Sequence, residues 1–204
     1  MMSQQVQKAE LRRLLLKQRR TASRISSRSL PKSIWKEKSD RIVSHLQSFP
    51  RFIEAKTILA YFSFRQEPDL SPLFRSEKQW GFPRIEGKSL IWHCWKLGDK
   101  LETNKYGILE PSIESKIIES QAVDLILIPT VACDRLGYRL GYGGGYYDRM
   151  LSSTQWSSHT TIGIVFDFAY LPQLPVDAWD KKLDFICTEE GIFNRRLRLR
   201  SVER

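Results

Sequence analysis

The chain has 204 residues, of which 41% are hydrophobic and 27% are charged, a composition that fits a single globular domain and lacks any apolar run of membrane-spanning length. Its three cysteines, Cys94, Cys133 and Cys187, form no CxxC pair, which argues against a disulfide framework or a zinc site and suits a reducing cytoplasm. The formal net charge of +10 is concentrated in residues 1–41 and 194–204, and the residues between them are slightly acidic. The acidic middle argues against nucleic-acid binding by the main part of the protein, and the basic ends serve either RNA contact or solubility.

Two helices are expected near the N-terminus. In residues 4–20 three leucines recur at i, i+3 and i+4, and Lys8 and Arg12 lie one turn apart on another face. A second helix is expected within residues 29–50, where a Ser and a Pro mark its start and Pro50 marks its end. Both helices are expected to pack an apolar face against the rest of the protein.

The remaining chain predicts a sheet. Apolar, β-branched and aromatic runs predict strands at 57–65, 88–97, 123–134, 160–168 and 185–193, and a short helix is expected within 69–80. Because these strands do not alternate in polarity, both faces of the sheet must be covered, which predicts a three-layer α/β/α protein with a largely parallel sheet. Ligands of such sheets bind beyond the carboxyl ends of the strands.

One loop stands in that position. Residues 139–151, "RLGYGGGYYDRML", follow the most apolar strand and lead into a helix expected near Tyr146. Arg139 can hold a phosphate through two hydrogen bonds, and Asp148 can hold Mg²⁺ that bridges phosphate oxygens. The loop matches neither GxGxxG nor GxxxxGK[ST], so a purely structural turn remains open beside phosphate binding. Four glycines could turn their backbone N–H groups toward one anion: Gly141, Gly143, Gly144 and Gly145.

The wider phrase "PTVACDRLGYRLGYGGGYYDRML" resembles the signature of the 5-formyltetrahydrofolate cyclo-ligase family, also called 5,10-methenyltetrahydrofolate synthetases. The segments "KAELRRLLLKQR", "FSFRQEPDL", "GILEP" and "LPVDAWDKKLDFICTE" resemble further family segments in the same order. The resemblance covers about 180 residues. It implies one cyclo-ligase domain over residues 1–193, followed by a basic tail at 194–204.

The resemblance implies a fold like that of sugar-phosphate isomerases and CoA-transferases, and a reaction that consumes ATP with Mg²⁺. The formyl oxygen of 5-formyltetrahydrofolate attacks the γ-phosphate, and N10 then displaces phosphate to give 5,10-methenyltetrahydrofolate. The protein positions two ligands and neutralises phosphate charge. Both substrates are the expected partners, and we expect a monomer with no specific nucleic acid and no membrane.

Family positions map onto the ATP side of this chain. Lys8 and Arg12 match N-terminal ATP contacts, although a solvated basic face is their plain alternative. Arg139 and Asp148 are the implied catalytic residues, and Asp148 with Asp180 the implied metal ligands; capping a helix and forming a turn are their alternative roles. The implied ATP loop consists of Arg139, Leu140, Gly141, Tyr142, Gly143, Gly144, Gly145, Tyr146 and Tyr147.

The folate side rests on fewer residues. Glu67 matches an acidic residue that accepts two donors from the pterin. Tyr106 and Tyr146 match aromatic positions near the folate, and Phe62 is either a pterin contact or part of the core. Cys133 shows no neighbouring base in the sequence and is expected to be a small core residue.

The chain departs from the family pattern at two positions. Trp179 stands where many members have His, and Gly144 stands where some have Lys or Arg, which puts the affinity for ATP in question. Three other functions stay open at this stage. They are an isomerase or CoA-transferase relative, a protein that binds RNA through its basic ends, and a thiamine-pathway relative that shares the glycine loop.

Overall fold

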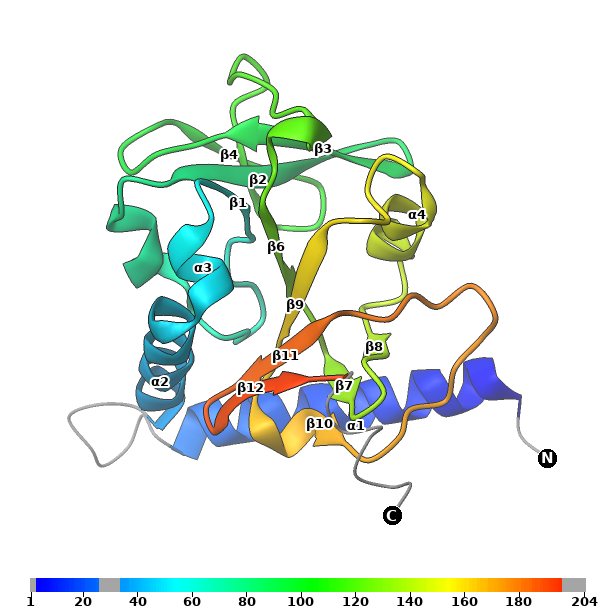
Figure 1. Ribbon diagram of the computed structural model, residues 1–204. Helices are drawn as coiled ribbons and strands as arrows, with labels where there is room; N and C mark the ends of the chain where they lie inside the picture. The colour runs from blue at the N-terminus through cyan, green and yellow to red at the C-terminus, as the bar shows by residue number, and fades with distance from the viewer. Residues whose placement is uncertain (1–2, 26–33, 196–204) are drawn as a thin grey trace.

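The computed structural model describes residues 3–25 and 34–195, arranged around one large sheet (Figure 1). The expected start of the second helix at 29–33 and the tail beyond Arg195 lie outside the described residues. The α-helices are α1 (Gln4–Ile25), α2 (Ile34–Ser48), α3 (Pro50–Glu54) and α4 (Tyr146–Ser152), and the 3₁₀ helices are η1 (Ser71–Arg75), η2 (Ser120–Ala122) and η3 (Asp167–Ala169).

The large sheet has seven strands in the order β12-β11-β9-β6-β1-β2-β3. Its inner strands are all parallel, and only the two edge strands β12 and β3 pair antiparallel with their neighbours. The strands are β12 (Gly191–Asn194), β11 (Phe185–Thr188), β9 (Thr160–Ile164), β6 (Leu125–Pro129), β1 (Thr57–Leu59), β2 (Gln79–Glu86) and β3 (Ser89–Cys94). The prediction of a largely parallel sheet is therefore confirmed.

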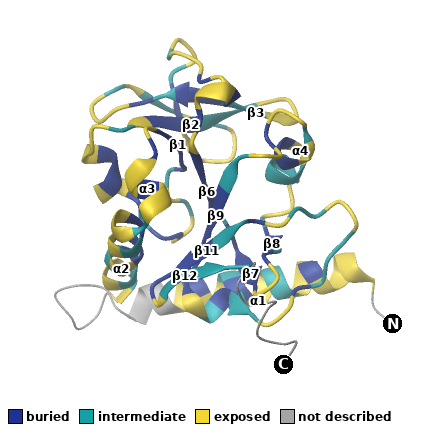
Figure 2. Ribbon diagram, in the orientation of Figure 1, coloured by how far each residue is buried: buried dark blue, intermediate teal, exposed yellow. Residues whose placement is uncertain are grey.

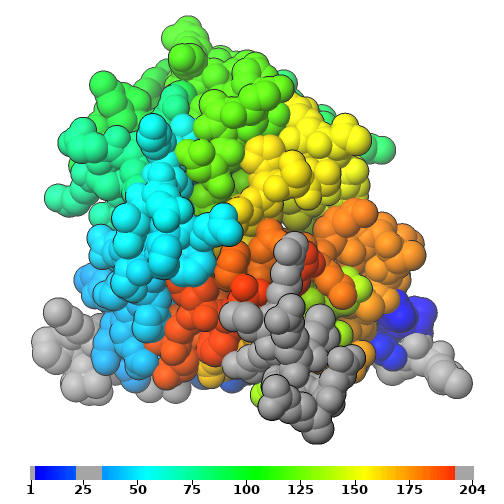
Figure 3. Space-filling view, in the orientation of Figure 1, coloured from blue at the N-terminus to red at the C-terminus, as the bar shows by residue number. Residues whose placement is uncertain are grey.

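Helices cover both faces of this sheet. Leu127 of β6 packs in a core with Ile42 of α2, while its neighbour Ile126 packs in a second core with Leu15 of α1 and Met150 of α4. The central strands are buried and the helices expose only their outer sides (Figure 2). On the first face, α2 lies against β11 and β12, and their atoms adjoin at the surface (Figure 3). This confirms the three-layer α/β/α prediction, because successive apolar residues of one strand need cover on opposite faces.

The predicted strand at 123–134 is in fact two strands, because the chain leaves the large sheet at Thr130. The Thr130 hydroxyl donates to the Ile164 carbonyl at 3.1 Å. Beyond it, β7 (Ala132–Asp134) pairs with β8 (Arg139–Leu140) and β10 (Tyr170–Leu171) in a separate sheet. The turn between β7 and β8 returns the chain toward β6, and so Arg139 and the glycines arrive at the carboxyl end of the large sheet.

Other element boundaries also differ from expectation. The strand at 57–65 ends at Leu59, and Arg65 and Gln66 adopt positive φ of 49° and 57° in a turn. The segment 185–193 is a hairpin of β11 and β12 rather than one strand. Within 69–80 only η1 is helical, and residue 79 already begins β2. A small hairpin of β4 (Leu101–Thr103) and β5 (Leu109–Pro111) was not predicted.

All three cysteines are free, as predicted. Cys133 is fully buried, and burial raises the pKa of its thiol to about 12, in agreement with its expected core role. Across residues 3–25 and 34–195, none of the helices combines the length and the apolar character needed to cross a membrane.

Candidate active site

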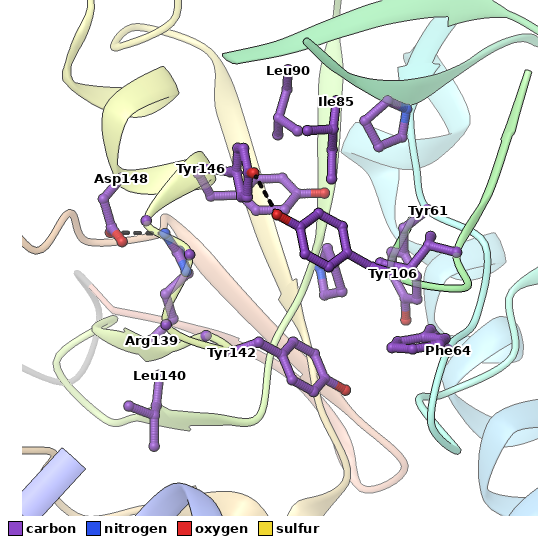
Figure 4. A pocket seen from close by; sticks show the side chains of 18 of the residues that line it. Tyr61, Phe64, Ile85, Leu90, Tyr106, Arg139, Leu140, Tyr142, Tyr146 and Asp148 are labelled. Carbon is purple, nitrogen blue, oxygen red and sulfur yellow. Dashed lines mark hydrogen bonds and ion pairs between the residues drawn. The ribbon is translucent and has the colours of Figure 1, made fainter. Parts of the chain in front are cut away.

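A cavity of about 650 Å³ opens at the carboxyl end of the parallel strands. Its walls come from α1, the segment after β1, the β2–β3 and β4–β5 hairpins, and the glycine loop (Figure 4). Every site residue expected from the sequence lines this one cavity, including Lys8, Glu67, Tyr106 and Asp180, which are far apart in the chain. An apolar wall formed by Ile85, Leu90 and their neighbours faces the polar glycine loop.

The glycine loop depends on backbone conformations that favour glycine. Gly143 has φ of 100°, and Gly145, with φ of 68°, is the residue that precedes α4. The Arg12 guanidinium lies beneath the loop, where its Nε donates to the Gly141 carbonyl at 2.7 Å. Because that carbonyl is held by Arg12, the loop can direct its N–H groups away from α1 and into the cavity.

Arg139 and Asp148 form an ion pair at the loop's base. The Arg139 Nη2 lies 2.7 Å from the Asp148 Oδ1 (Figure 4), and the Arg139 guanidinium also lies over the Tyr147 ring. Arg139 is buried, while Asp148 remains partly open to the cavity. The buried Nε of Arg139 has no hydrogen-bond partner among the described residues, so the loop's base contains an unsatisfied donor. Asp148 does not cap α4, so that alternative role is not observed.

Lys8 is held by two carboxylates instead of facing solvent. Its Nζ lies 2.6 Å from Asp177 Oδ2 and 2.5 Å from Asp180 Oδ2. Burial disfavours the charge of Lys8, but the hydrogen bonds that Lys8 donates to Asp177 and Asp180 raise its pKa overall. The solvated-face alternative is therefore wrong for Lys8. The contact also shows that Asp180 does more than form a turn, and it adds Asp177, which the sequence did not suggest.

Glu67 lies in the opposite wall and is 3% exposed. Burial raises the pKa of its carboxyl to about 7, although Arg19, the Phe64 N–H and the Tyr142 hydroxyl each act to lower it. The Phe64 N–H donates to Glu67 Oε2 at 3.1 Å. A carboxyl with this pKa changes its charge near neutral pH, and its acceptor oxygens suit a ligand that carries paired N–H donors.

The residues expected around Glu67 occupy two different settings. Phe62 stacks on Phe82, with ring centroids 4.1 Å apart, and also lines the cavity, so it belongs to the core and to the wall at once. The hydroxyls of Tyr106 and Tyr146 face each other at 3.5 Å across the mouth (Figure 4). Tyr106 is exposed by 48%, which leaves its ring available to a ligand.

Arg19 is a functional candidate that the sequence analysis missed. It is 2% exposed, and its guanidinium donates to the Tyr142 hydroxyl at 3.0 Å and to the Thr130 carbonyl at 2.8 Å. A signal was present, because Lys8, Arg12 and Arg19 fall at i, i+4 and i+11 on one helical face. Only the fold shows that this face is turned toward the protein interior.

Two carboxylates could hold a metal, but they do not form a dedicated metal cage. Asp148 is paired with Arg139 and Asp180 with Lys8, and the described part of the chain contains no group of three His, Cys, Asp or Glu side chains arranged for a metal. Mg²⁺ is commonly held by one or two carboxylates together with substrate phosphates. The donors present therefore fit a cation that arrives with a phosphate ligand.

Fold and cavity together define an α/β enzyme with a glycine-rich loop facing an aromatic and carboxylate-lined wall. Residues 4–189 match the model of the 5-formyltetrahydrofolate cyclo-ligase family. The chain therefore belongs to this family of C–N bond-forming ligases. The match does not favour the RNA-binding, isomerase or CoA-transferase alternatives.

Individual relatives agree with the family match. The 5-formyltetrahydrofolate cyclo-ligase of Escherichia coli K12 is 28% identical over 174 residues, covering 81% of this chain and 96% of the relative. That of Haemophilus influenzae is 30% identical and covers 64% and 74%. The NMR structure of Aquifex aeolicus 5,10-methenyltetrahydrofolate synthetase is 33% identical, superposes with a TM-score of 0.78 and covers 93% of each chain.

Proposed function

We propose that this protein converts 5-formyltetrahydrofolate to 5,10-methenyltetrahydrofolate and consumes ATP with Mg²⁺. In the first step the formyl oxygen forms a bond to the γ-phosphorus while the bond from that phosphorus to the β–γ bridging oxygen breaks, which releases ADP. In the second step N10 forms a bond to the formyl carbon, loses its proton, and the carbon–oxygen bond to phosphate breaks. Phosphorylation is needed because a formamide oxygen is otherwise a poor leaving group.

The ATP side of the cavity is assigned to α1 and the glycine loop. Lys8, Arg12 and Arg139 neutralise phosphate charge, and the backbone of residues 139–147 surrounds the phosphate oxygens. Lys8 must exchange part of its contact with Asp177 and Asp180 when a phosphate binds. Support comes from the burial of Lys8 and Arg139 at one end of the same cavity.

Asp148 is the proposed main protein ligand of Mg²⁺, and Asp180 the proposed second one. When bound with ATP, this ion supplies charge neutralisation at the transferring phosphoryl group. Arg139 orients the Asp148 carboxylate through their ion pair. In the same way, Lys8 restrains the Asp180 carboxylate at the cavity wall.

The folate side is assigned to the opposite wall. Glu67 accepts hydrogen bonds from the aminopyrimidine edge of the pterin, Phe62 contributes the edge of an aromatic wall, and Tyr106 and Tyr146 close over the ligand. In this proposal the formyl group lies between the glycine loop and Glu67. The two ligands then meet inside one cavity, as a direct phosphoryl transfer requires.

One observation carries the proposal. Three segments spread over more than a hundred residues of chain line one cavity, and they are α1, residues 62–67 and the glycine loop. The two ends of this cavity suit an anion and an aromatic ring that carries donors. We propose further that residues 1–193 form one cyclo-ligase domain that acts as a cytoplasmic monomer with no specific nucleic-acid partner. The three free cysteines support the reducing compartment.

The test is to mix purified protein with 5-formyltetrahydrofolate and Mg·ATP and to follow the near-ultraviolet absorbance of methenyltetrahydrofolate. The absorbance should grow only when ATP and Mg²⁺ are both present. Asp148→Ala should reduce kcat/KM by about 100-fold or more, which corresponds to about 2.7 kcal/mol of transition-state stabilisation. The matched control is Asp40→Ala, which removes an exposed aspartate paired with Lys36 on α2. A folded wild-type protein that produces no absorbance change with saturating ligands would overturn the proposal.

A further inference from the structure

Arg19 is a buried cation of α1 that lies behind the cavity wall, outside the set of residues that line it. One Nη donates to the Thr130 carbonyl, where the chain leaves the large sheet, and the other donates to the Tyr142 hydroxyl. A buried guanidinium is expensive to desolvate unless its donors are satisfied. Here they are directed at the backbone carbonyls of Thr130 and Val131 and at one phenol of the glycine loop.

Tyr142 connects that cation to the opposite wall of the cavity. Its ring projects from the glycine loop toward Phe64, with ring centroids 6.5 Å apart (Figure 4), and the Arg65 guanidinium lies 5.9 Å from its centroid. Its hydroxyl accepts a hydrogen bond from Arg19 and acts to lower the pKa of the nearby Glu67 carboxyl. The Phe64 N–H, next to the Tyr142 ring, donates to Glu67 Oε2 at 3.1 Å. The direction is consistent along the chain of contacts, because the guanidinium only donates, the carboxylate only accepts, and the phenol can do both.

We propose that Arg19 and Tyr142 are positioning residues that hold the Glu67 carboxylate for the folate substrate and link it to the glycine loop, so that folate and ATP bind cooperatively. The proposal rests on the proposed function and goes beyond it by naming the physical connection between the two ligand sites. Neither the hydroxyl of Tyr142 nor Arg19 needs to touch a reacting atom for this role.

The coupling follows from where Tyr142 is attached. It lies between Gly141 and Gly143, so any ligand that fixes the Glu67 carboxylate also fixes the part of the loop whose N–H groups are assigned to phosphate. The Glu67 side is also defined by its backbone, because Arg65 and Gln66 hold positive φ immediately before it. Ordering one side therefore removes part of the entropy cost of ordering the other.

The electrostatic surroundings of Glu67 give this link a measurable signature. Burial raises the pKa of Glu67, and Arg19 and Tyr142 act against that rise, so loss of either contact should move the titration of Glu67 to higher pH. The charged and titratable groups that face Glu67 come from α1, the glycine loop, α4, the segment after β1 and the adjoining turn, and they are Arg19, Tyr142, Tyr147, Tyr61 and Arg65.

The decisive variant is Tyr142→Phe, which removes one hydroxyl and keeps the ring. We expect KM for 5-formyltetrahydrofolate to rise about tenfold with kcat little changed, and the pH midpoint of kcat/KM to move upward. Calorimetric titration with a non-hydrolysable ATP analogue, with and without 5-formyltetrahydrofolate, measures the coupling directly. The folate should strengthen analogue binding at least fivefold in the wild type and have almost no effect in Tyr142→Phe.

Tyr138→Phe is the matched control, because Tyr138 lies outside the cavity-lining set and the change removes the same single atom. Arg19→Met should act in the same direction as Tyr142→Phe, and if it fails to fold, Tyr142→Phe decides alone. An unchanged KM, pH midpoint and coupling in Tyr142→Phe would overturn the inference. Carbon-13 NMR titration of the Glu67 carboxyl in the ligand-free protein tests the effect of Tyr142 and Arg19 on Glu67 without any turnover. If the wild type converts no folate, only the proposed function is overturned, and this titration still tests the further inference.

Discussion

Glu67 shows how a binding residue can work against the stability of its own fold. The pKa of its carboxyl is about 7 in the folded protein against an ordinary value of 4.5, with burial as the main cause. Between these two values the folded state binds more protons than the unfolded state, so stability falls as pH rises through this window and levels off above it. The ionised form suits the folate donors, so function and stability favour opposite charge states.

Glu67→Gln should therefore separate the effect of the Glu67 charge on stability from its effect on folate binding. At pH 8 we expect the free energy of unfolding to rise by about 2 kcal/mol, because the substitution removes a buried charge, and at pH 4.5 we expect little difference. Chemical denaturation at both pH values measures this. The same variant should raise KM for 5-formyltetrahydrofolate, because an amide replaces one acceptor with a donor. A variant that is destabilised equally at both pH values would contradict the raised pKa.

At the scale of elements, the glycine loop is the segment whose backbone conformation should affect ligand binding most. Gly143 has φ of 100°, and a Cβ built on it would lie 3.7 Å from the Arg12 Cζ, which is ordinary contact distance. Substitution there would strain the backbone without a steric clash. The damage should therefore fall on the direction of the loop's N–H groups.

Gly143→Ala should raise KM for ATP at least tenfold while lowering the free energy of unfolding by only about 1 kcal/mol. Gly87→Ala, in the β2–β3 turn, is the matched control, because Gly87 also has positive φ and open space around it. It should show a similar loss of stability and an unchanged KM for ATP. Steady-state kinetics with both variants makes the comparison, and equal kinetics for the two would remove the phosphate role from the loop.

At the scale of the whole molecule, one sheet is shared by two cores. Ile126 and Leu127 are adjacent, both fully buried, and belong to different cores. Loss of packing on one face must therefore disturb strands that also support the other face, which predicts a single cooperative unfolding transition.

Ile126→Ala and Leu127→Ala test this from opposite faces of one strand. Each should lower the free energy of unfolding by about 2–5 kcal/mol, and in each variant the far-ultraviolet circular dichroism and tryptophan fluorescence should change at the same denaturant concentration. The fluorescence reports on both cores, because Trp95 lies in one and Trp92 in the other. Separate transitions for the two probes would contradict the proposal of one domain.

The sequence by itself determined the architecture and the place of the site. Uninterrupted apolar residues such as those of β6 need cover on both faces, so a three-layer fold with a parallel sheet followed from local composition. The glycine loop and the basic face of α1 could also be predicted, because the residues that form each of them are close together in the sequence. These features depend on short stretches of chain.

Only the tertiary structure decided the rest. β2 was missed although it contains eight residues, because Gly81 and Pro83 oppose a strand prediction. In the fold, the pairing of β2 with β1 ends at Gly81. Pro83 therefore lies beyond the end of β1, where its missing N–H donor removes no hydrogen bond to that strand. Whether a segment tolerates such a residue depends on where its neighbour ends.

The same reason applies to the site. Arg19 meets Tyr142 and Thr130 across more than a hundred residues of chain, and Lys8 meets Asp177 and Asp180 across more than 160. Each of these residues is an ordinary surface type in the sequence. Their burial and their pairing arise only when the chain leaves the sheet at Thr130 and returns the glycine loop to α1, a path set by contacts among residues distant in sequence.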